Sequence, residues 1–160
     1  MLSCNLCLSL WLKDLLAWRA DYLQQKILPI ILPKGLELIE QHRQQGDTLL
    51  IITATNSFLT TPIAELLKID NLIATDPEML DGRYTGKVFG VPSFQHGKVE
   101  RLQHWLDEHQ QDLAGSYFYS DSHNDLPLLE QVDTPIAVDP DDKLAEVARQ
   151  RDWKILSLRE

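Results

Sequence analysis

The sequence predicts a layered α/β domain with a mostly parallel β-sheet. Two observations support this prediction. Short apolar runs such as TLLIIT at residues 48–53 suit strands that are buried on both faces of a sheet. Segments with apolar residues at helical spacing separate these runs, and strands that alternate with helices are typical of parallel sheets. The 160 residues are enough for a single domain with a substantial core.

The expected elements follow in order along the chain. Helical spacing predicts a helix over residues 10–28, which Pro29 and Pro33 end, and a second helix over 34–45, which Gly46 closes. The segment DGRYTGKVFGVPSF at residues 81–94 begins with an Asp-Gly turn and continues with alternating β-formers, so it predicts a hairpin or flap. The other predicted strands cover 48–53, 72–75, 117–119, 136–138 and 153–158, and the other predicted helices cover 62–68, 98–109 and 141–151.

The charge balance limits the classes of partner. Acidic residues outnumber basic ones by 24 to 15, which gives a net charge of −9 at pH 7. Such a chain repels nucleic acid backbones and anionic membranes, so neither is an expected partner. A small phosphorylated metabolite remains an expected ligand, because a few local donors and a metal ion can override the global charge inside a pocket.

The first residues of the sequence are apolar and contain both cysteines. No positive residue precedes the run Leu2–Leu12, and Lys13 and Asp14 interrupt it, so we expect neither a signal peptide nor a membrane span. Cys4 and Cys7 form a single C-x-x-C without a second pair, and we interpret their spacing as chance placement in a helix. The expected location is the cytoplasm.

Polar residues at the ends of three predicted elements are the candidate site residues, since ligands of parallel sheets collect at the carboxyl ends of strands. Thr53 ends a strand and could donate its hydroxyl to a phosphoryl oxygen, and Thr55 and Asn56 lie where the next turn exposes donors. Lys98 begins a helix, where its charge opposes the helix dipole. It could neutralise a phosphate, or it could be an ordinary surface lysine.

Asp121 and Asp125 are the most specific candidates. Asp121 ends an aromatic strand, and Asp125 follows four positions later, beside Asn124. Two carboxylates on one short loop can hold Mg²⁺, with water in the remaining positions. The alternative is that both aspartates cap the helix that follows, a common role for Asp.

Three motifs in this order resemble the haloacid dehalogenase superfamily, in particular its phosphoserine phosphatase-like subfamily. They are LLIITATN at residues 49–56, GKVERL at 97–102 and YSDSHNDLPLLE at 119–130. The resemblance implies a Rossmann-like three-layer α/β/α core over residues 31–160 and a helical remnant of a cap over residues 1–30. It also implies hydrolysis of a small phosphomonoester, such as phosphoserine or histidinol phosphate, with Mg²⁺ as cofactor.

The resemblance assigns roles residue by residue. Thr53 would hydrogen-bond the phosphoryl group, and Lys98 would stabilise its charge. Asp121 would ligate Mg²⁺, Asp125 would support the waters of the metal and orient Lys98, and Asn124 would lie near the substrate.

One departure from the family pattern is important. Family members begin with a strand that ends in D-x-D-x-T, whose first aspartate attacks phosphorus and whose second is the general acid and base. The 160 residues contain no such motif. We therefore expect a core without its central strand, most of the cap to be absent, and a chain that is inactive alone. The alternatives are a module that binds phosphate or Mg²⁺ without turnover, and a structural remnant.

Overall fold

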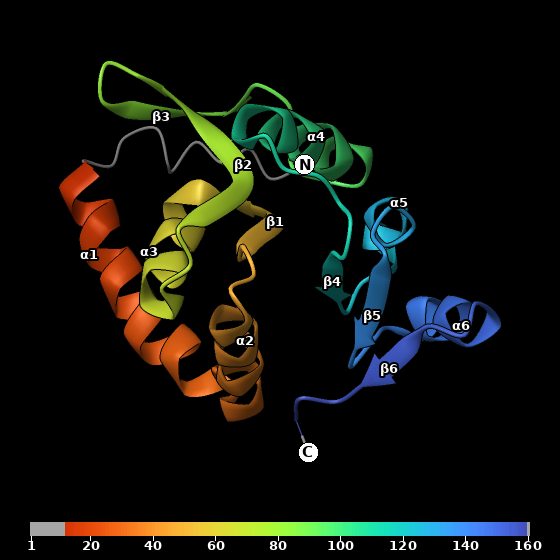
Figure 1. The fold of residues 1–160 in the computed structure, drawn as a ribbon. Helices are drawn as coiled ribbons and strands as arrows, with labels where there is room; N and C mark the ends of the chain where they lie inside the picture. Colours follow the sequence, from red (N-terminus) through yellow and green to blue (C-terminus); the bar gives the residue numbers. More distant parts are fainter. Residues whose placement is uncertain (1–11, 160) are drawn as a thin grey trace. The chain divides into compact units, whose positions relative to one another are not determined.

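The computed structural model describes residues 12–159, which form two compact units (Figure 1). The first unit contains residues 12–31 and 36–93, and the second contains residues 32–35 and 94–159. The division into a cap over residues 1–30 and a core over 31–160 stays a prediction. Cys4, Cys7 and the first two residues of the predicted helix 10–28 lie outside the described residues.

Helices begin the first unit, as the sequence predicted. Helix α1 (Leu12–Tyr22) continues into the π-turn η2 (Leu23–Ile27) and the 3₁₀ turn η3 (Leu28–Ile30). Helix α2 (Pro33–Gln45) follows, and Gly46 ends it with φ +83°. Glycine has no Cβ to oppose a positive φ, which is why it commonly closes helices.

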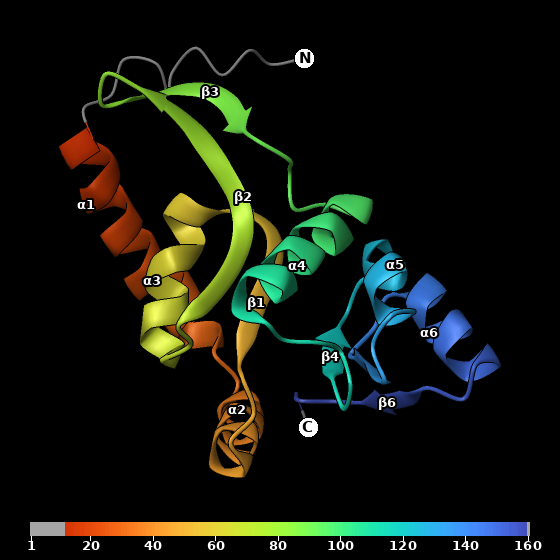
Figure 2. The same ribbon diagram turned by 45° about the horizontal axis from the view of Figure 1, so that its top comes forward.

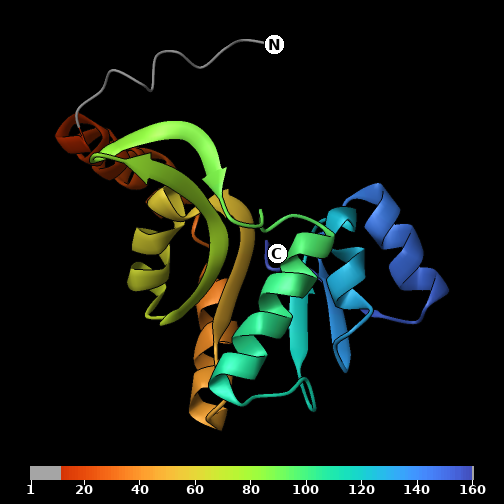
Figure 3. The ribbon, with the colours of Figure 1, turned by 90° about the horizontal axis from the view of Figure 1, so that it is seen from above.

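The sheet of the first unit has the order β1-β2-β3. Strand β1 (Leu50–Asn56) runs parallel to β2 (Asn71–Leu80), which pairs antiparallel with β3 (Arg83–Phe89). Asp81 and Gly82 form the tight turn between β2 and β3 with φ values of +50° and +74°. Figure 3 shows β2 as a long curved strand that extends into the hairpin. The hairpin prediction is confirmed, but β2 is longer than the predicted strand because it also forms the first arm.

Helix α3 (Ser57–Leu67) begins five residues before the predicted start at Pro62. Asn56 begins it, because the Asn56 side chain accepts a hydrogen bond of 3.0 Å from the Leu59 N–H. Pro62 lies inside the helix and has no N–H to donate to the carbonyl of Phe58, four residues earlier. Arg19 takes the place of this donor, with Nη1 2.9 Å from the Phe58 oxygen.

The second unit is a parallel α/β sheet of order β4-β5-β6. Its strands are β4 (Tyr117–Ser120), β5 (Thr134–Val138) and β6 (Lys154–Leu156), and its helical segments are α4 (His96–His109), η4 (His123–Asp125), α5 (Leu126–Leu129) and α6 (Asp142–Gln150). Leu129 of α5 and Leu144 and Ala148 of α6 pack in one buried cluster with Ala137 of β5. Both helices therefore cover the same face of the sheet, as Figure 2 shows.

The predicted α/β class with mostly parallel strands is confirmed. The described strands form two three-stranded sheets, one in each unit. Strand β1 is at one edge of the first sheet, and β4 is at one edge of the second. No helix within residues 12–159 is long and apolar enough to span a membrane.

Candidate active site

Lys98 and Asp125 form a buried ion pair in the second unit. Lys98 lies in the first turn of α4, yet its side chain is only 8% exposed, so the interpretation as a surface lysine is wrong. Its Nζ lies 2.5 Å from Asp125 Oδ1. The other carboxylate oxygen of Asp125 accepts a hydrogen bond of 2.7 Å from Ser120 Oγ, at the end of β4. Both oxygens of Asp125 are thus engaged, and the ammonium is held in a fixed position.

Asp121 begins the loop that follows β4, and its side chain is exposed. The residues after it form the short 3₁₀ turn η4, which Ser122 caps by accepting a hydrogen bond from the Asn124 N–H. Asp125 precedes α5, but its side chain makes no capping hydrogen bond there. The capping interpretation of Asp125 is therefore wrong, because its carboxylate binds Lys98 and Ser120.

Asn124 lies between these two aspartates, with its side-chain amide bonded at both ends. Its Nδ2 lies 3.2 Å from Ser122 Oγ, within the same loop. Its Oδ1 accepts a hydrogen bond of 3.3 Å from Nε2 of Gln95, which precedes helix α4. The loop that carries Asp121 is thus connected to the start of the helix that carries Lys98.

Asp141 also holds the loop of residues 121–125 in place through hydrogen bonds to Asp121 and His123. Its backbone N–H donates to the Asp121 carbonyl at 2.8 Å, and its Oδ2 lies 2.9 Å from the His123 backbone nitrogen and 2.8 Å from His123 Nδ1. Its Oδ1 accepts from the Leu144 N–H and caps α6. Burial opposes ionisation of Asp141, but the hydrogen bonds from the His123 and Leu144 N–H groups and from the His123 ring lower its pKa to about 2.

Thr53, Thr55 and Asn56 all lie within β1, in the first unit. The predicted strand end at Thr53 is wrong, because β1 continues through Thr55 and ends at Asn56. Thr53 Oγ1 accepts a hydrogen bond of 3.2 Å from the Thr55 N–H, so the hydroxyl proton of Thr53 can still be donated to a ligand. Thr55 is exposed. The side-chain oxygen Oδ1 of Asn56 caps α3 by accepting from the Leu59 N–H, which leaves the side-chain NH₂ group of Asn56 as a possible donor to a ligand.

The described residues offer a partial set of metal ligands. Within residues 12–159, no three His, Cys, Asp or Glu side chains are grouped so that they could hold a metal ion. Asp121 is an exposed carboxylate, and Mg²⁺ often keeps several waters and binds through only one or two carboxylates. Asp121 could therefore be one ligand of a hydrated Mg²⁺, and the described residues supply no full ligand set.

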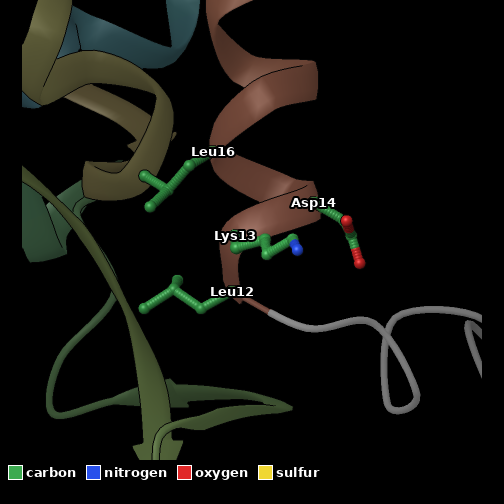
Figure 4. A pocket seen from close by; sticks show the side chains of 4 residues that line it. All are labelled: Leu12, Lys13, Asp14 and Leu16. Atoms are coloured by element: carbon green, nitrogen blue, oxygen red, sulfur yellow. The ribbon is translucent and has the colours of Figure 1, made fainter.

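A cavity of about 630 Å³ lies at the start of α1, far along the sequence from the loop of Asp121. Leu12, Lys13, Asp14 and Leu16 line it, and Figure 4 shows the two leucines turned away from the two charged side chains. None of the predicted site residues borders this cavity. It does not contribute to the candidate site.

A family model described as haloacid dehalogenase-like hydrolase matches residues 7–130. The chain belongs to this family. Its residue range includes all three motifs that carried the resemblance, from LLIITATN to YSDSHNDLPLLE.

Two relatives and one solved structure are similar to the chain over most of its length. A histidinol-phosphatase of Neisseria meningitidis is 40% identical over 92% of this chain and 68% of its own length. The phosphoserine phosphatase SerB1 of Mycobacterium tuberculosis is 34% identical over 77% of this chain, which spans only 40% of that protein. The crystal structure of a protein with unknown function from Bordetella pertussis has a TM-score of 0.92 and 43% identity, over 96% of this chain and 70% of that one.

The sequence did not identify three residues that support the site: Ser120, Gln95 and Asp141. Asp141 lies three residues after β5 ends at Val138, whereas Asp121 directly follows β4, so the rule that site residues follow parallel strands indicates Asp141 only loosely. Ser120 directly precedes Asp121 and is buried. No sequence pattern indicates Gln95, because its contact with Asn124 depends on an unusual backbone conformation.

Proposed function

We propose that this chain binds the phosphoryl group of a small phosphomonoester, and that the protein hydrolyses this ester. The buried ion pair of Lys98 and Asp125 carries the proposal. Removing each charge of such a pair from water costs roughly several kcal/mol. In many proteins, replacing a buried ion pair by well-packed apolar residues leaves the fold at least as stable. A buried ammonium beside a partly exposed loop of polar side chains is therefore better explained by binding an anion than by stability alone.

Lys98 would donate to a phosphoryl oxygen and balance charge as the ester bond breaks. Asp125 and Ser120 would hold the ammonium in place, so that little reorganisation is needed when the ligand arrives. Asn124 would be a further donor to the substrate. The roles that the family resemblance gives to Thr53, Thr55 and Asn56, which lie in the first unit, stay predictions. Phosphoserine and histidinol phosphate are the proposed substrate types, by analogy with the names of the relatives.

Mg²⁺ would be held by the Asp121 carboxylate and water, with Asp125 supporting the waters. When bound, it would neutralise charge on the phosphoryl oxygens. Binding through one carboxylate should be weak, so calorimetry on the 160-residue chain should show little heat at millimolar Mg²⁺. Tight binding that disappears in Asp121→Ala would contradict this assignment, because it would require a more complete site.

The proposed reaction passes through an aspartyl-phosphate, formed when an aspartate carboxylate displaces the alcohol from phosphorus and then cleaved by water. No D-x-D-x-T motif is present in the 160 residues, so a second candidate function is binding of phosphate or Mg²⁺ without turnover. An aryl phosphate assay tests whether the 160 residues turn over an ester on their own. We expect no turnover by this chain, and turnover that is lost in Lys98→Met would show that the chain is itself catalytic.

Titration with inorganic phosphate, followed by NMR, tests the binding step directly. We expect the amide resonances of residues 121–125 to shift in the wild type and to stay unchanged in Lys98→Met, which keeps the length of the side chain but removes its charge. Lys143→Met, at an exposed lysine on α6, is the matched control and should bind phosphate like the wild type. Equal binding by the wild type and Lys98→Met would refute the proposed function.

A further inference from the structure

Gln95 has a backbone conformation that rarely occurs in residues with a side chain. Its φ is +48° and its ψ is −119°. The Gly97 N–H donates to the Phe94 carbonyl at 2.9 Å, which makes Gln95 the second residue of a tight turn. These angles are those of the type II′ turn, where glycine is the usual residue at this position. A glutamine here is strained, and such strain occurs most often at functional sites.

The side chain of Gln95 does not stabilise its own helix. Gln95 is the residue before α4, where a polar side chain commonly caps the helix, but it makes no capping hydrogen bond. Instead its Nε2 donates to Asn124 Oδ1, 29 residues away, at 3.3 Å. The Gln95 carbonyl also accepts from the Lys98 N–H at 3.0 Å. One strained residue therefore contacts both Lys98 and the loop between Asp121 and Asp125.

We propose that Gln95 is a positioning residue, which orients the Asn124 amide toward the phosphoryl group of the substrate. The Gln95 donor and the Ser122 hydroxyl fix the two ends of the Asn124 amide. The second N–H of Asn124 Nδ2 is then the donor that Asn124 can offer to an anion. This role rests on the proposed function, since it concerns the same phosphoryl ligand.

Two substitutions at Gln95 separate orientation from folding. Gln95→Met keeps the positive φ and the length of the side chain but removes the donor. Gln95→Gly removes the donor and also relieves the strain, because glycine adopts a positive φ freely. Gln103→Met is the matched control, since Gln103 lies on the same helix and donates to Asp107 on the surface.

The probe is inorganic phosphate, titrated into the full 160-residue chain and followed by the side-chain NH₂ resonances of Asn124. Losing one hydrogen bond should weaken phosphate binding by about threefold to tenfold in both Gln95 variants. The Asn124 resonances should also move in both variants without phosphate, and Gln103→Met should leave affinity and resonances unchanged. We expect Gln95→Gly to raise the melting temperature by about 2–4 °C while it weakens binding.

Wild-type affinity in both Gln95 variants would overturn the proposal, as would a stability loss in Gln95→Gly without any change at Asn124. If the wild type does not bind phosphate, the proposed function fails. The Asn124 resonances then still decide whether Gln95 orients this amide: unchanged resonances in both variants would overturn that orientation as well.

Discussion

Lys98 Nζ and Asp125 Oδ1 lie 2.5 Å apart, and the two side chains are only 8% and 11% exposed. Removing the carboxylate should leave a buried ammonium without a counter-charge. We therefore expect Asp125→Ala to lower the free energy of unfolding by about 3–5 kcal/mol, as measured by urea denaturation. In the double variant with Lys98→Met, part of this loss should be recovered.

The pair of Arg151 and Glu130 is the control for this prediction. Arg151 Nη1 and Glu130 Oε1 are also 2.5 Å apart, but their side chains are 46% and 43% exposed. Water screens such a pair, so Glu130→Ala should change stability by no more than about 1 kcal/mol. Similar losses of stability for Glu130→Ala and Asp125→Ala would show that burial does not increase the cost of breaking the pair of Lys98 and Asp125.

Arg19 substitutes for the backbone donor that Pro62 lacks, and this predicts a coupling between the two residues. Arg19→Ala leaves the Phe58 carbonyl without its donor and should destabilise the wild type by about 1–3 kcal/mol. In a Pro62→Ala background, the new N–H can bond this carbonyl as an ordinary helical donor, so Arg19→Ala should cost clearly less. A double-mutant cycle by thermal or urea denaturation measures the difference. Equal costs in both backgrounds would mean that Arg19 acts only through its contact with the Phe58 ring.

The sequence predicted the order and type of the elements well, because apolar spacing decides both. It missed the start of α3, since Pro62 is a common first residue of a helix and the sequence does not show that Arg19, 39 residues away from Phe58, supplies the missing donor. The length of β2 was also missed, because residues 76–80 are held by pairing with β3 and not by an apolar run of their own.

The candidate site was predictable where short motifs carry the chemistry. Asp121, Asn124 and Asp125 lie in one short segment after β4, and their motif alone indicated them as candidates. The resemblance predicted that Asp125 contacts Lys98, but not that Ser120 Oγ donates to the other oxygen of Asp125, because the sequence does not show that Ser120 is buried. Asp141 contacts His123 across 18 residues of sequence, and Gln95 contacts Asn124 across 29. The spacing of residues within a short motif cannot predict contacts between segments so far apart in the sequence.

Asp141 predicts a pH dependence of stability. Its pKa is lowered in the folded state to about 2, from an ordinary value of 3.8, so its contribution to stability is present above 3.8 and is lost as the pH falls through about 2. Asp141→Asn keeps a good helix cap but removes the charge. We expect the variant to be less stable than the wild type at neutral pH, and the difference in urea midpoint to shrink as the pH falls from 3.8 toward 2.

Asp142→Asn controls for the change in net charge, because it removes the same charge one residue later, at an exposed position. A pH-independent difference between wild type and Asp141→Asn would mean that the carboxylate charge of Asp141 does not stabilise the fold. The same pH dependence in both variants would assign the effect to net charge.

Strand β1 predicts a pattern of hydrogen exchange within the first unit. It is an edge strand of its sheet, and within residues 12–159 it pairs only with β2, whereas β2 pairs with both β1 and β3. In a parallel pair, successive amides point to opposite sides, so alternate N–H groups of β1 should point away from β2. We expect these amides to exchange quickly and those of β2 to exchange slowly, as measured by NMR on the monomeric chain. An unpaired strand edge also invites pairing with another chain, so the protection of β1 should rise at high protein concentration. Slow exchange along the whole of β1 in the dilute monomer would contradict the prediction, because it would mean that the outer edge of β1 already has a hydrogen-bonding partner.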